Sequence, residues 1–305
     1  MGARALEAGE PTAAAAPAGT RQPSNARAAA WMAGWLSSML VIAVAGREAQ
    51  RELHVFQIML MRSVIGLFML WPLVRAAGGW SAMRTTRLGL HVVRNSVHYG
   101  GQFAWFYALT LIPLAQVVSI EFTMPIWVAG LAAIFLGERL DAWKICAVAL
   151  GLVGVAIIVG PDTGAVQAGQ WIALAAAIGF GVSVIMVKSL TRTESVVAII
   201  FWMLVIQSAI GIAPALATWR TPSAHVWPWI LLIAFVGTFS HYCMARAMLH
   251  ADASVVVPMD FLRVPLTAAA GWLLYNERID RWTVLGAALI LIGNLLNLRR
   301  RSPVS

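Results

Sequence analysis

Two acidic side chains stand inside long apolar stretches of this sequence, at matching places in its two halves. A shift of 139 residues superimposes Glu121-Phe122 on Asp260-Phe261. A charge held at the centre of a bilayer costs about 2.5–3.5 kcal/mol, so each such carboxylate needs a physical reason to be there. These acids could bind an ammonium group of a ligand, or they could form ion pairs that hold helices together.

Arginines share the same apolar stretches: Arg62, Arg94, Arg246 and Arg263. Arg263 follows Asp260 by three residues, so the two lie on one helical face and can pair directly. Arg62 has no acid on its own helix and must pair with Glu121, with Asp260, or with a ligand carboxylate through two parallel hydrogen bonds. A zwitterionic amino acid would satisfy acids and arginines together. The alternative is a set of buried salt bridges with a structural role only.

A polar and aromatic face runs along the stretch from 88 to 110. His98, Gln102 and Trp105 follow one another at the spacing of a single helix face, and the 139-residue shift places Gln102 on His241. The two histidines could form a proton relay, and helix packing is the alternative. The sequence therefore predicts one substrate-binding set: Arg62, His98, Gln102, Trp105, Glu121, His241, Asp260 and Arg263.

Arg94 and Arg246 lie within a turn or two of the helix ends that we expect to face the cytoplasm. We predict a gate there, with snorkelling of the two side chains to the headgroups as the alternative. The sequence contains no nucleophile motif, phosphate-binding glycine loop or metal-ligand cluster. We therefore expect no catalytic residue, metal or cofactor, and no enzyme.

Composition identifies the environment that these residues need. Of the 305 residues, 60% are apolar and 11% are charged, whereas a soluble domain has about 25% charged residues. The solvent for most of the chain is therefore the lipid bilayer. The net charge of +9 is scattered, apart from Arg299 to Arg301, and so excludes a nucleic-acid partner.

Ten apolar segments have about the 20 residues that a membrane-spanning helix requires. They cover residues 28–46, 53–74, 88–110, 113–136, 142–160, 169–190, 195–217, 227–250, 253–275 and 281–298. We expect a disordered tail at 1–27 and a basic tail at 299–305. A signal peptide is the alternative for the first segment, because Ala43-Val44-Ala45 resembles a cleavage site.

Orientation follows from the distribution of lysine and arginine. With a cytoplasmic N-terminus, the inner segments hold 13 of these residues and the outer loops hold 5. Cytoplasmic loops of membrane proteins carry such an excess. Both termini are therefore predicted to be cytoplasmic.

An internal repeat divides the chain into halves at 28–160 and 169–298. The 139-residue shift places Glu138-Arg139-Leu140-Asp141-Ala142-Trp143 on Glu277-Arg278-Ile279-Asp280-Arg281-Trp282. Each half has five segments, an odd number, so the second half must enter the membrane upside down. The predicted fold class is thus an all-α integral membrane protein of ten transmembrane helices, built as two inverted repeats. A duplicated scaffold without transport activity is the alternative.

Prolines interrupt corresponding segments of the two halves. Pro125 cannot hydrogen-bond back to the carbonyl of Glu121, and Pro265 leaves the carbonyl of Phe261 free in the same way. Open backbone at membrane depth is tolerated where it is buried in protein or faces water. We expect the segments 113–136 and 253–275 to form the walls of a central cavity.

The motifs resemble the EamA family of the drug/metabolite transporter superfamily. The similarity is carried by Val93-Arg94-Asn95, Phe106-Tyr107-Ala108-Leu109, Pro113-Leu114-Ala115 and Phe135-Leu136-Gly137-Glu138. It covers about residues 28–298 and implies a ten-helix transporter of the bacterial inner membrane, comparable first with YddG-like amino-acid exporters. The small multidrug exporters of the superfamily use a glutamate in their first helix. Residues 28–46 contain no acid, so that proton-coupled mechanism does not carry over.

The leading functional hypothesis is export of amino acids or related small metabolites by alternating access. Uptake of a cofactor-like solute, such as a vitamin or S-adenosylmethionine, is the alternative. A membrane-embedded enzyme is disfavoured by short loops poor in reactive residues, and a sensor would require a fused soluble domain. The sequence leaves open the substrate, the direction, the coupling ion, and whether the protein is a monomer or a homodimer.

Overall fold

The computed structural model describes residues 25–136, 142–159, 167–248, 250, 259–260, 262–278 and 280–298. The described part of the chain is helical, with a short 3₁₀ turn at Gly79–Met83 and no strand. Residues 1–24 of the predicted tail at 1–27 lie outside these residues, as do the predicted tail at 299–305 and Glu138 and Asp141 of the first repeat motif.

The helices overlap all ten predicted segments. They are α1 (Asn25–Ala49), α2 (Val55–Ala76), α3 (Leu88–Leu111), α4 (Leu114–Glu121), α5 (Met124–Leu136), α6 (Ala142–Val159), α7 (Ala168–Leu190), α8 (Val196–Ala217), α9 (Trp227–Met248), α11 (Arg263–Tyr275) and α12 (Arg281–Leu298). The largest differences from expectation lie in the first and fourth segments. The first helix covers Asn25–Ala49 instead of 28–46, and the segment 113–136 forms two helices instead of one.

Five helices are long and apolar enough to cross a membrane by their length and composition. They are α1, α2, α7, α8 and α9, with 18 to 24 residues in the apolar span. Large apolar side chains also face outward from the bundle, with Phe68 75% exposed and Leu273 70% exposed. An outer surface of this kind is stable against lipid and would associate in water. The chain is a multi-pass membrane protein.

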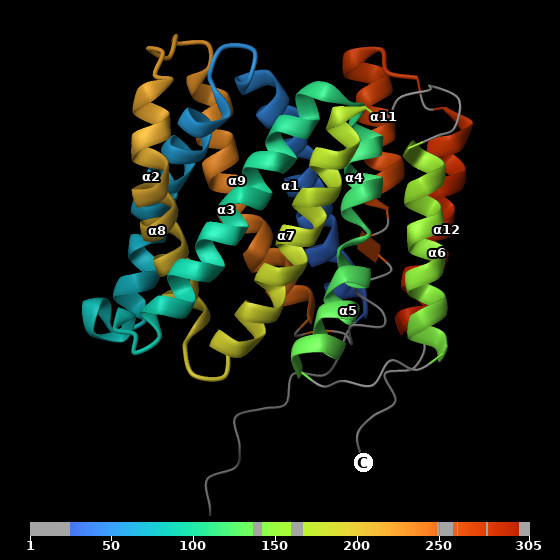
Figure 1. Ribbon diagram of the computed structural model, residues 1–305. Helices are drawn as coiled ribbons and strands as arrows, with labels where there is room; N and C mark the ends of the chain where they lie inside the picture. Colours follow the sequence, from blue (N-terminus) through green and yellow to red (C-terminus); the bar gives the residue numbers. More distant parts are fainter. Residues whose placement is uncertain are drawn as a thin grey trace, which may run out of the picture.

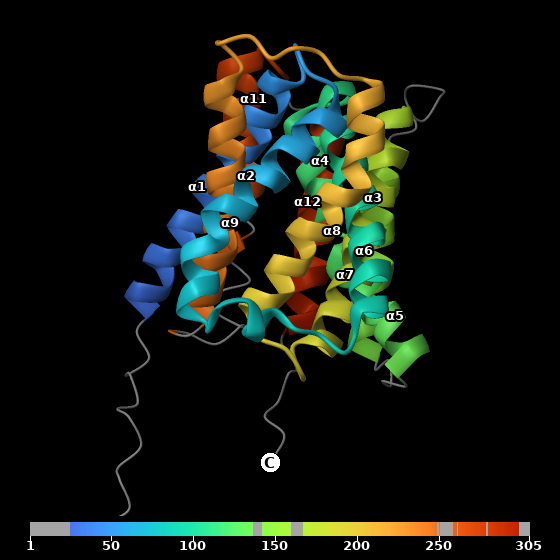
Figure 2. The same ribbon diagram turned by 90° about the vertical axis from the view of Figure 1, so that its left-hand side faces the viewer.

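Helices from the two halves pack in pairs (Figure 1). The pairs are α1 with α9, α3 with α7, α2 with α8, α6 with α12, and α4 with α11. The last two pairs lie on the right of Figure 1, and α2 and α8 lie on the left; Figure 2 shows α2 crossing α9. Glycines permit the closest approach: a Cβ atom on Gly154 of α6 would lie 2.6 Å from the carbonyl oxygen of Gly286 in α12.

The break between α4 and α5 falls where proline removes a backbone donor. α4 ends at Glu121, and Pro125 follows within the first turn of α5. Thr123 replaces part of the lost bonding, since its hydroxyl donates to the Ile120 carbonyl at 2.7 Å and accepts from the Trp127 indole at 3.1 Å. The predicted proline interruption is confirmed here, and it places Glu121 at a helix end inside the bundle. Pro258 lies outside the described residues.

Candidate functional site

The two intramembrane acids meet at one arginine. Arg263, the first residue of α11, donates from Nη1 to Glu121 Oε1 at 3.0 Å, and its Nε lies 3.7 Å from Asp260 Oδ1. All three side chains are largely buried, with 7% of Arg263, 13% of Glu121 and 16% of Asp260 exposed. The predicted pairing of Asp260 with Arg263 is confirmed. The link from Glu121 to the same guanidinium joins α4 to α11.

Two tryptophans donate hydrogen bonds to these acids. Only one of them, Trp105, was predicted from the sequence as a site residue. The Trp105 indole of α3 donates to Glu121 Oε2 at 2.8 Å, and the Trp35 indole of α1 donates to Asp260 Oδ1 at 2.6 Å. The Arg263 guanidinium also lies 4.7 Å from the centre of the Phe122 ring. An indole N–H is a donor only, so each one pairs with a carboxylate oxygen as acceptor. Trp35 lies in the middle of the predicted segment 28–46, and this position of a polar N–H inside an apolar segment was the signal available in the sequence.

Two carboxylates share one guanidinium in this central cluster, which we define as Trp35, Trp105, Glu121, Asp260 and Arg263. With both acids ionised, its formal charge is −1 because two negative groups face one positive group. A buried net charge is expensive unless it is compensated. The cluster can therefore take up one further positive charge, such as a substrate ammonium, a proton or a monovalent cation.

Arg62 lies apart from both acids. Among the described residues, no carboxylate comes within ion-pairing distance of its guanidinium, and no hydrogen bond to it is formed. The side chain is partly buried on α2. Of the three partners expected for Arg62, neither Glu121 nor Asp260 pairs with it in the structure, and binding of a ligand carboxylate stays a prediction.

The predicted polar face of α3 divides into two environments. Gln102 Nε2 lies 3.1 Å from His98 Nε2, and the His98 ring contacts Phe180 of α7 at 5.4 Å between ring centres. Trp105 instead points to Glu121. His98 and Gln102 thus form a local pair at the α3–α7 interface. The side chain of His241 on α9 lies outside the described residues, so its predicted relay with His98 stays a prediction.

The two arginines of the predicted gate differ in their surroundings. Arg94 is 7% exposed, and it donates to Ser183 Oγ of α7 at 2.9 Å and to Asn95 Oδ1 at 2.7 Å. It is therefore buried between α3 and α7, and snorkelling is wrong for this residue. Arg246 lies on α9, with its guanidinium 5.3 Å from the Trp31 ring centre. The gate role of both residues remains a prediction.

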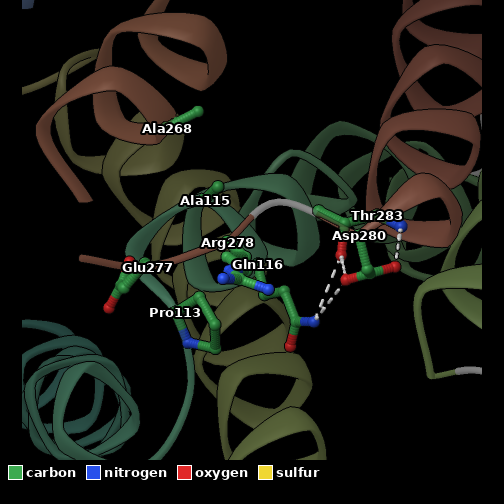
Figure 3. Close-up of a pocket in the computed structure, with 8 residues that line it drawn as sticks. All are labelled: Pro113, Ala115, Gln116, Ala268, Glu277, Arg278, Asp280 and Thr283. Carbon is green, nitrogen blue, oxygen red and sulfur yellow. Dashed lines mark hydrogen bonds between the residues drawn. The ribbon is translucent and has the colours of Figure 1, made fainter. Parts of the chain in front are cut away.

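The second repeat motif joins four helices at the end of the bundle drawn at the top of Figure 1. Arg47 of α1 pairs with Glu277, and also donates to the carbonyl of Ile112 at 3.0 Å. Glu277 accepts in turn from the backbone N–H of Leu114 at 3.0 Å, at the start of α4. Figure 3 shows Gln116 of the same helix reaching Asp280 and Thr283 of the α12 start. Glu277 and Asp280 thus link the ends of neighbouring helices through an ion pair and hydrogen bonds, which is a structural role.

A polar contact at the opposite end was not predicted. His91 of α3 lies 2.6 Å from Glu194 in the turn between α7 and α8, and Thr85 donates to the same carboxylate. Arg87 donates to the Ser189 carbonyl at 2.8 Å beside it. Glu194 lies in a turn, and no spacing or motif in the sequence indicates its partners. This contact ties the 3₁₀ region before α3 to the turn after α7.

Comparison with known proteins identifies the class. The model of the EamA-like transporter family matches residues 28–160 and 167–299. The chain belongs to the EamA-like transporter family. It is therefore a membrane transporter of the drug/metabolite transporter superfamily and not an enzyme.

Individual relatives are named for different solutes. A riboflavin transporter of Brucella anthropi is 33% identical over 251 residues, which cover 79% of this chain and 87% of the relative. An S-adenosylmethionine uptake transporter of Rickettsia prowazekii is 26% identical, covering 80% and 83%. The pseudopaline exporter CntI of Pseudomonas aeruginosa is also 26% identical, covering 81% and 87%. A solved structure with a TM-score of 0.62 and 18% identity covers 89% of this chain and 96% of that one, and it shows the fold alone.

Proposed function

We propose that this protein is a secondary transporter of a cofactor-like organic solute, working by alternating access in the bacterial inner membrane with both termini cytoplasmic. Flavins are the first candidates, because riboflavin transporters are among its relatives at more than 30% identity. The observation that carries the proposal is an unequal number of acidic and basic groups inside the bundle: Glu121 and Asp260 share one guanidinium, that of Arg263, and Arg62 has no carboxylate partner among the described residues. These side chains would face a solute crossing the bundle.

The helix pairing supports ten spans arranged as an inverted repeat. In this arrangement, α1 and α7 correspond, as do α3 and α9. Exchange of the halves then converts the α1–α9 pair into the α7–α3 pair, while α2–α8 and α6–α12 each map onto themselves. The α4–α11 contact joins the segments 113–136 and 253–275, which correspond to each other under the same exchange. Substrate in such transporters binds near the midplane between the repeats. We place the substrate site, including Arg62, Glu121, Asp260 and Arg263, at that position.

Export of amino acids or their derivatives is the second candidate. The acidic central cluster could bind an ammonium group and Arg62 a carboxylate, which matches a zwitterion. A relative named as an exporter of pseudopaline adds support from the comparisons.

The decisive test is transport into proteoliposomes that contain the purified protein. Radiolabelled riboflavin, S-adenosylmethionine and a panel of amino acids would be measured with and without an imposed proton or sodium gradient. Saturable riboflavin uptake, absent from protein-free liposomes, is expected. Transport of amino acids without riboflavin would reject the first candidate in favour of the second. No transport of any of these solutes would reject both.

Topology is tested separately. Reporter fusions at the C-terminus and in the loop around Arg220 should give opposite signals, because the proposed orientation puts them on opposite sides of the membrane. Equal signals would reject the orientation and the inverted repeat with it.

A further inference from the structure

A polar cleft opens at the end of the bundle that carries the Arg47–Glu277 pair. Its volume is about 630 Å³, and it lies between the α1–α2 loop, the end of α3 and the loop after α8. Its lining includes Arg51, Glu52, His54, Tyr107, Trp219 and Arg220. Ligand pockets for small organic molecules have volumes of about 300–1,000 Å³. The cleft is therefore large enough for a cofactor-sized solute.

Stacked aromatic rings lead from this cleft into the bundle along α2 and α3. His54 and Tyr107 line the cleft, and their rings lie 5.1 Å from Phe56 and 5.8 Å from Phe103. Phe56 and Phe103 are stacked at 4.6 Å between ring centres. Phe56 is also parallel to Tyr99, at 6.5 Å and 3° between the ring planes. We call the five rings the aromatic ladder.

The inner end of the ladder carries polar groups without partners. Tyr99 is 6% exposed and Gln207 of α8 is 1% exposed. Among the described residues, neither the Tyr99 hydroxyl nor either amide atom of Gln207 has a hydrogen-bond partner. Leaving a buried polar group unpaired costs about 1–3 kcal/mol. The Tyr99 hydroxyl and the two amide atoms of Gln207 would be satisfied by hydrogen bonds to a bound polar group.

Backbone contacts bring these side chains to the same level as Arg62. A Cβ atom on Gly211 of α8 would lie 3.1 Å from the Tyr99 hydroxyl and 3.6 Å from Leu60 Cβ. Gln207 precedes Gly211 by one helical turn, on the same face. Arg62 follows Leu60 by two residues on α2, so its backbone lies at this level of the bundle. The ladder thus ends among two hydrogen-bonding side chains without partners, at the level of an arginine that has no carboxylate partner among the described residues.

We infer that the cleft and the aromatic ladder form an entry route and binding site for a planar heteroaromatic solute with a polar tail. The ring system stacks on Tyr107 and Phe103, whereas the hydroxyl or anionic groups of the tail bind Tyr99, Gln207 and Arg62. This inference rests on the proposed transport function and gives its substrate a chemical class. Ring stacking of this kind contributes about 1–3 kcal/mol.

Helix packing by itself explains why the inner rings of the aromatic ladder are buried, but it does not explain an exposed ring at the outer end. Tyr107 is 41% exposed at the cleft, so part of its ring is available to a ligand. A comparable stack, Phe235 on Phe239 in α9, has ring planes 10° apart and no contact with the cleft lining. It provides a matched control for loss of a stacked ring.

The test measures binding to the purified protein in nanodiscs by quenching of flavin fluorescence. Riboflavin carries both ring and ribityl tail, whereas lumichrome presents a related ring system without the tail. Phe103→Leu should weaken binding of both probes about tenfold, through loss of stacking. Gln207→Met should weaken riboflavin binding about tenfold and leave lumichrome binding within twofold. Phe235→Leu should leave both affinities unchanged.

Several outcomes would overturn the inference. They are no binding of either probe to the wild-type protein, unchanged affinities in Phe103→Leu, or equal losses in Phe103→Leu and Phe235→Leu. Thermal unfolding of each variant shows whether it has a folding defect. If Phe103→Leu has such a defect, Tyr107→Leu, at an exposed position, replaces it as the variant that removes a ring. Binding with the expected pattern but without riboflavin transport would reject the proposed function and leave the binding site standing.

Discussion

Two groups of charged and polar side chains lie inside this bundle, and they differ in how completely they are paired. In the central cluster, Glu121 and Asp260 each have an indole donor and share Arg263. At the inner end of the aromatic ladder, the Tyr99 hydroxyl and the Gln207 amide make no hydrogen bond within the described residues. Tyr99 is 6% exposed and Gln207 is 1% exposed, so exposure to water does not explain their missing partners. Arg62, at the same level, is partly buried and has no ion pair among the described residues.

The difference separates side chains whose removal leaves a protein partner unpaired from side chains whose removal does not. Removing one member of a buried, paired set strands its partner and costs about 3–5 kcal/mol. Removing a group that has no protein partner strands nothing. Stability should therefore be sensitive to the central cluster, and transport should be sensitive to the ladder end. Each prediction below tests this contrast.

The largest effect is expected for Arg263→Gln. The change leaves Glu121 and Asp260 facing each other without a cation, and both are largely buried. We expect a loss of about 3–5 kcal/mol in unfolding free energy, measured as a lower melting temperature in detergent. The double change to Glu121→Gln and Asp260→Asn in the same background removes the stranded charge and should restore most of the loss. Unchanged stability in Arg263→Gln would contradict a structural role for the cluster.

Arg62→Gln should produce the opposite result. No described carboxylate depends on this guanidinium, so the melting temperature should stay the same or rise as a partly buried charge without an ion pair is removed. Transport should fall at least about tenfold, because a charge-assisted hydrogen bond to the solute contributes about 1.5–3 kcal/mol. Liposome transport and thermal unfolding of the same preparation make the comparison. Full transport with unchanged stability would remove Arg62 from the site.

The sequence predicted individual groups better than their partners. Charge inside apolar segments identified Glu121, Asp260, Arg62 and Arg263, because burial of a charge is expensive whatever the fold. Helical spacing gave the Asp260–Arg263 pair, a local relation. The indole of Trp35 lies 225 positions from Asp260, and no spacing rule connects residues so far apart. Only the packing of α1 against α9 and α11 brings them together.

The polar residues of the ladder end show a second limit of sequence reasoning. Gln207 is an uncharged amide in the middle of an otherwise apolar segment, and this signal was available in the sequence. Its significance depends on the absence of partners in the folded chain, which only coordinates reveal. The proline break after Glu121 was predictable, since proline acts through the backbone of its own helix.

Trp105→Phe and Trp35→Phe should have intermediate effects. Each removes one indole donor and keeps an aromatic ring, so one carboxylate oxygen in the central cluster loses its hydrogen bond. We expect about 1–3 kcal/mol of destabilisation for either variant, less than for Arg263→Gln. Trp80→Phe is the matched control, because Trp80 is 64% exposed and lies outside the cluster. Losses equal to that of the control would show that the indole N–H groups contribute nothing.

The smallest effect concerns Glu52, at the rim of the cleft. Its carboxylate accepts from the backbone N–H of Ser223 at 2.5 Å and from the Ser223 hydroxyl at 2.7 Å, which joins the α1–α2 loop to the loop after α8. These hydrogen bonds hold the pKa of Glu52 below its ordinary value of 4.5. A lowered pKa in the folded state means that the contact contributes to stability above pH 4.5 and is lost as the pH falls through the folded value.

Hydrogen-exchange protection of the Ser223 region, corrected for the intrinsic exchange rate, should therefore decrease below pH 4.5 in the wild type. Glu52→Gln should show weaker protection that is independent of pH, with an unchanged global melting temperature, because this contact involves only two exposed loops. A pH-dependent loss of the same size in Glu52→Gln would assign the titration to another group.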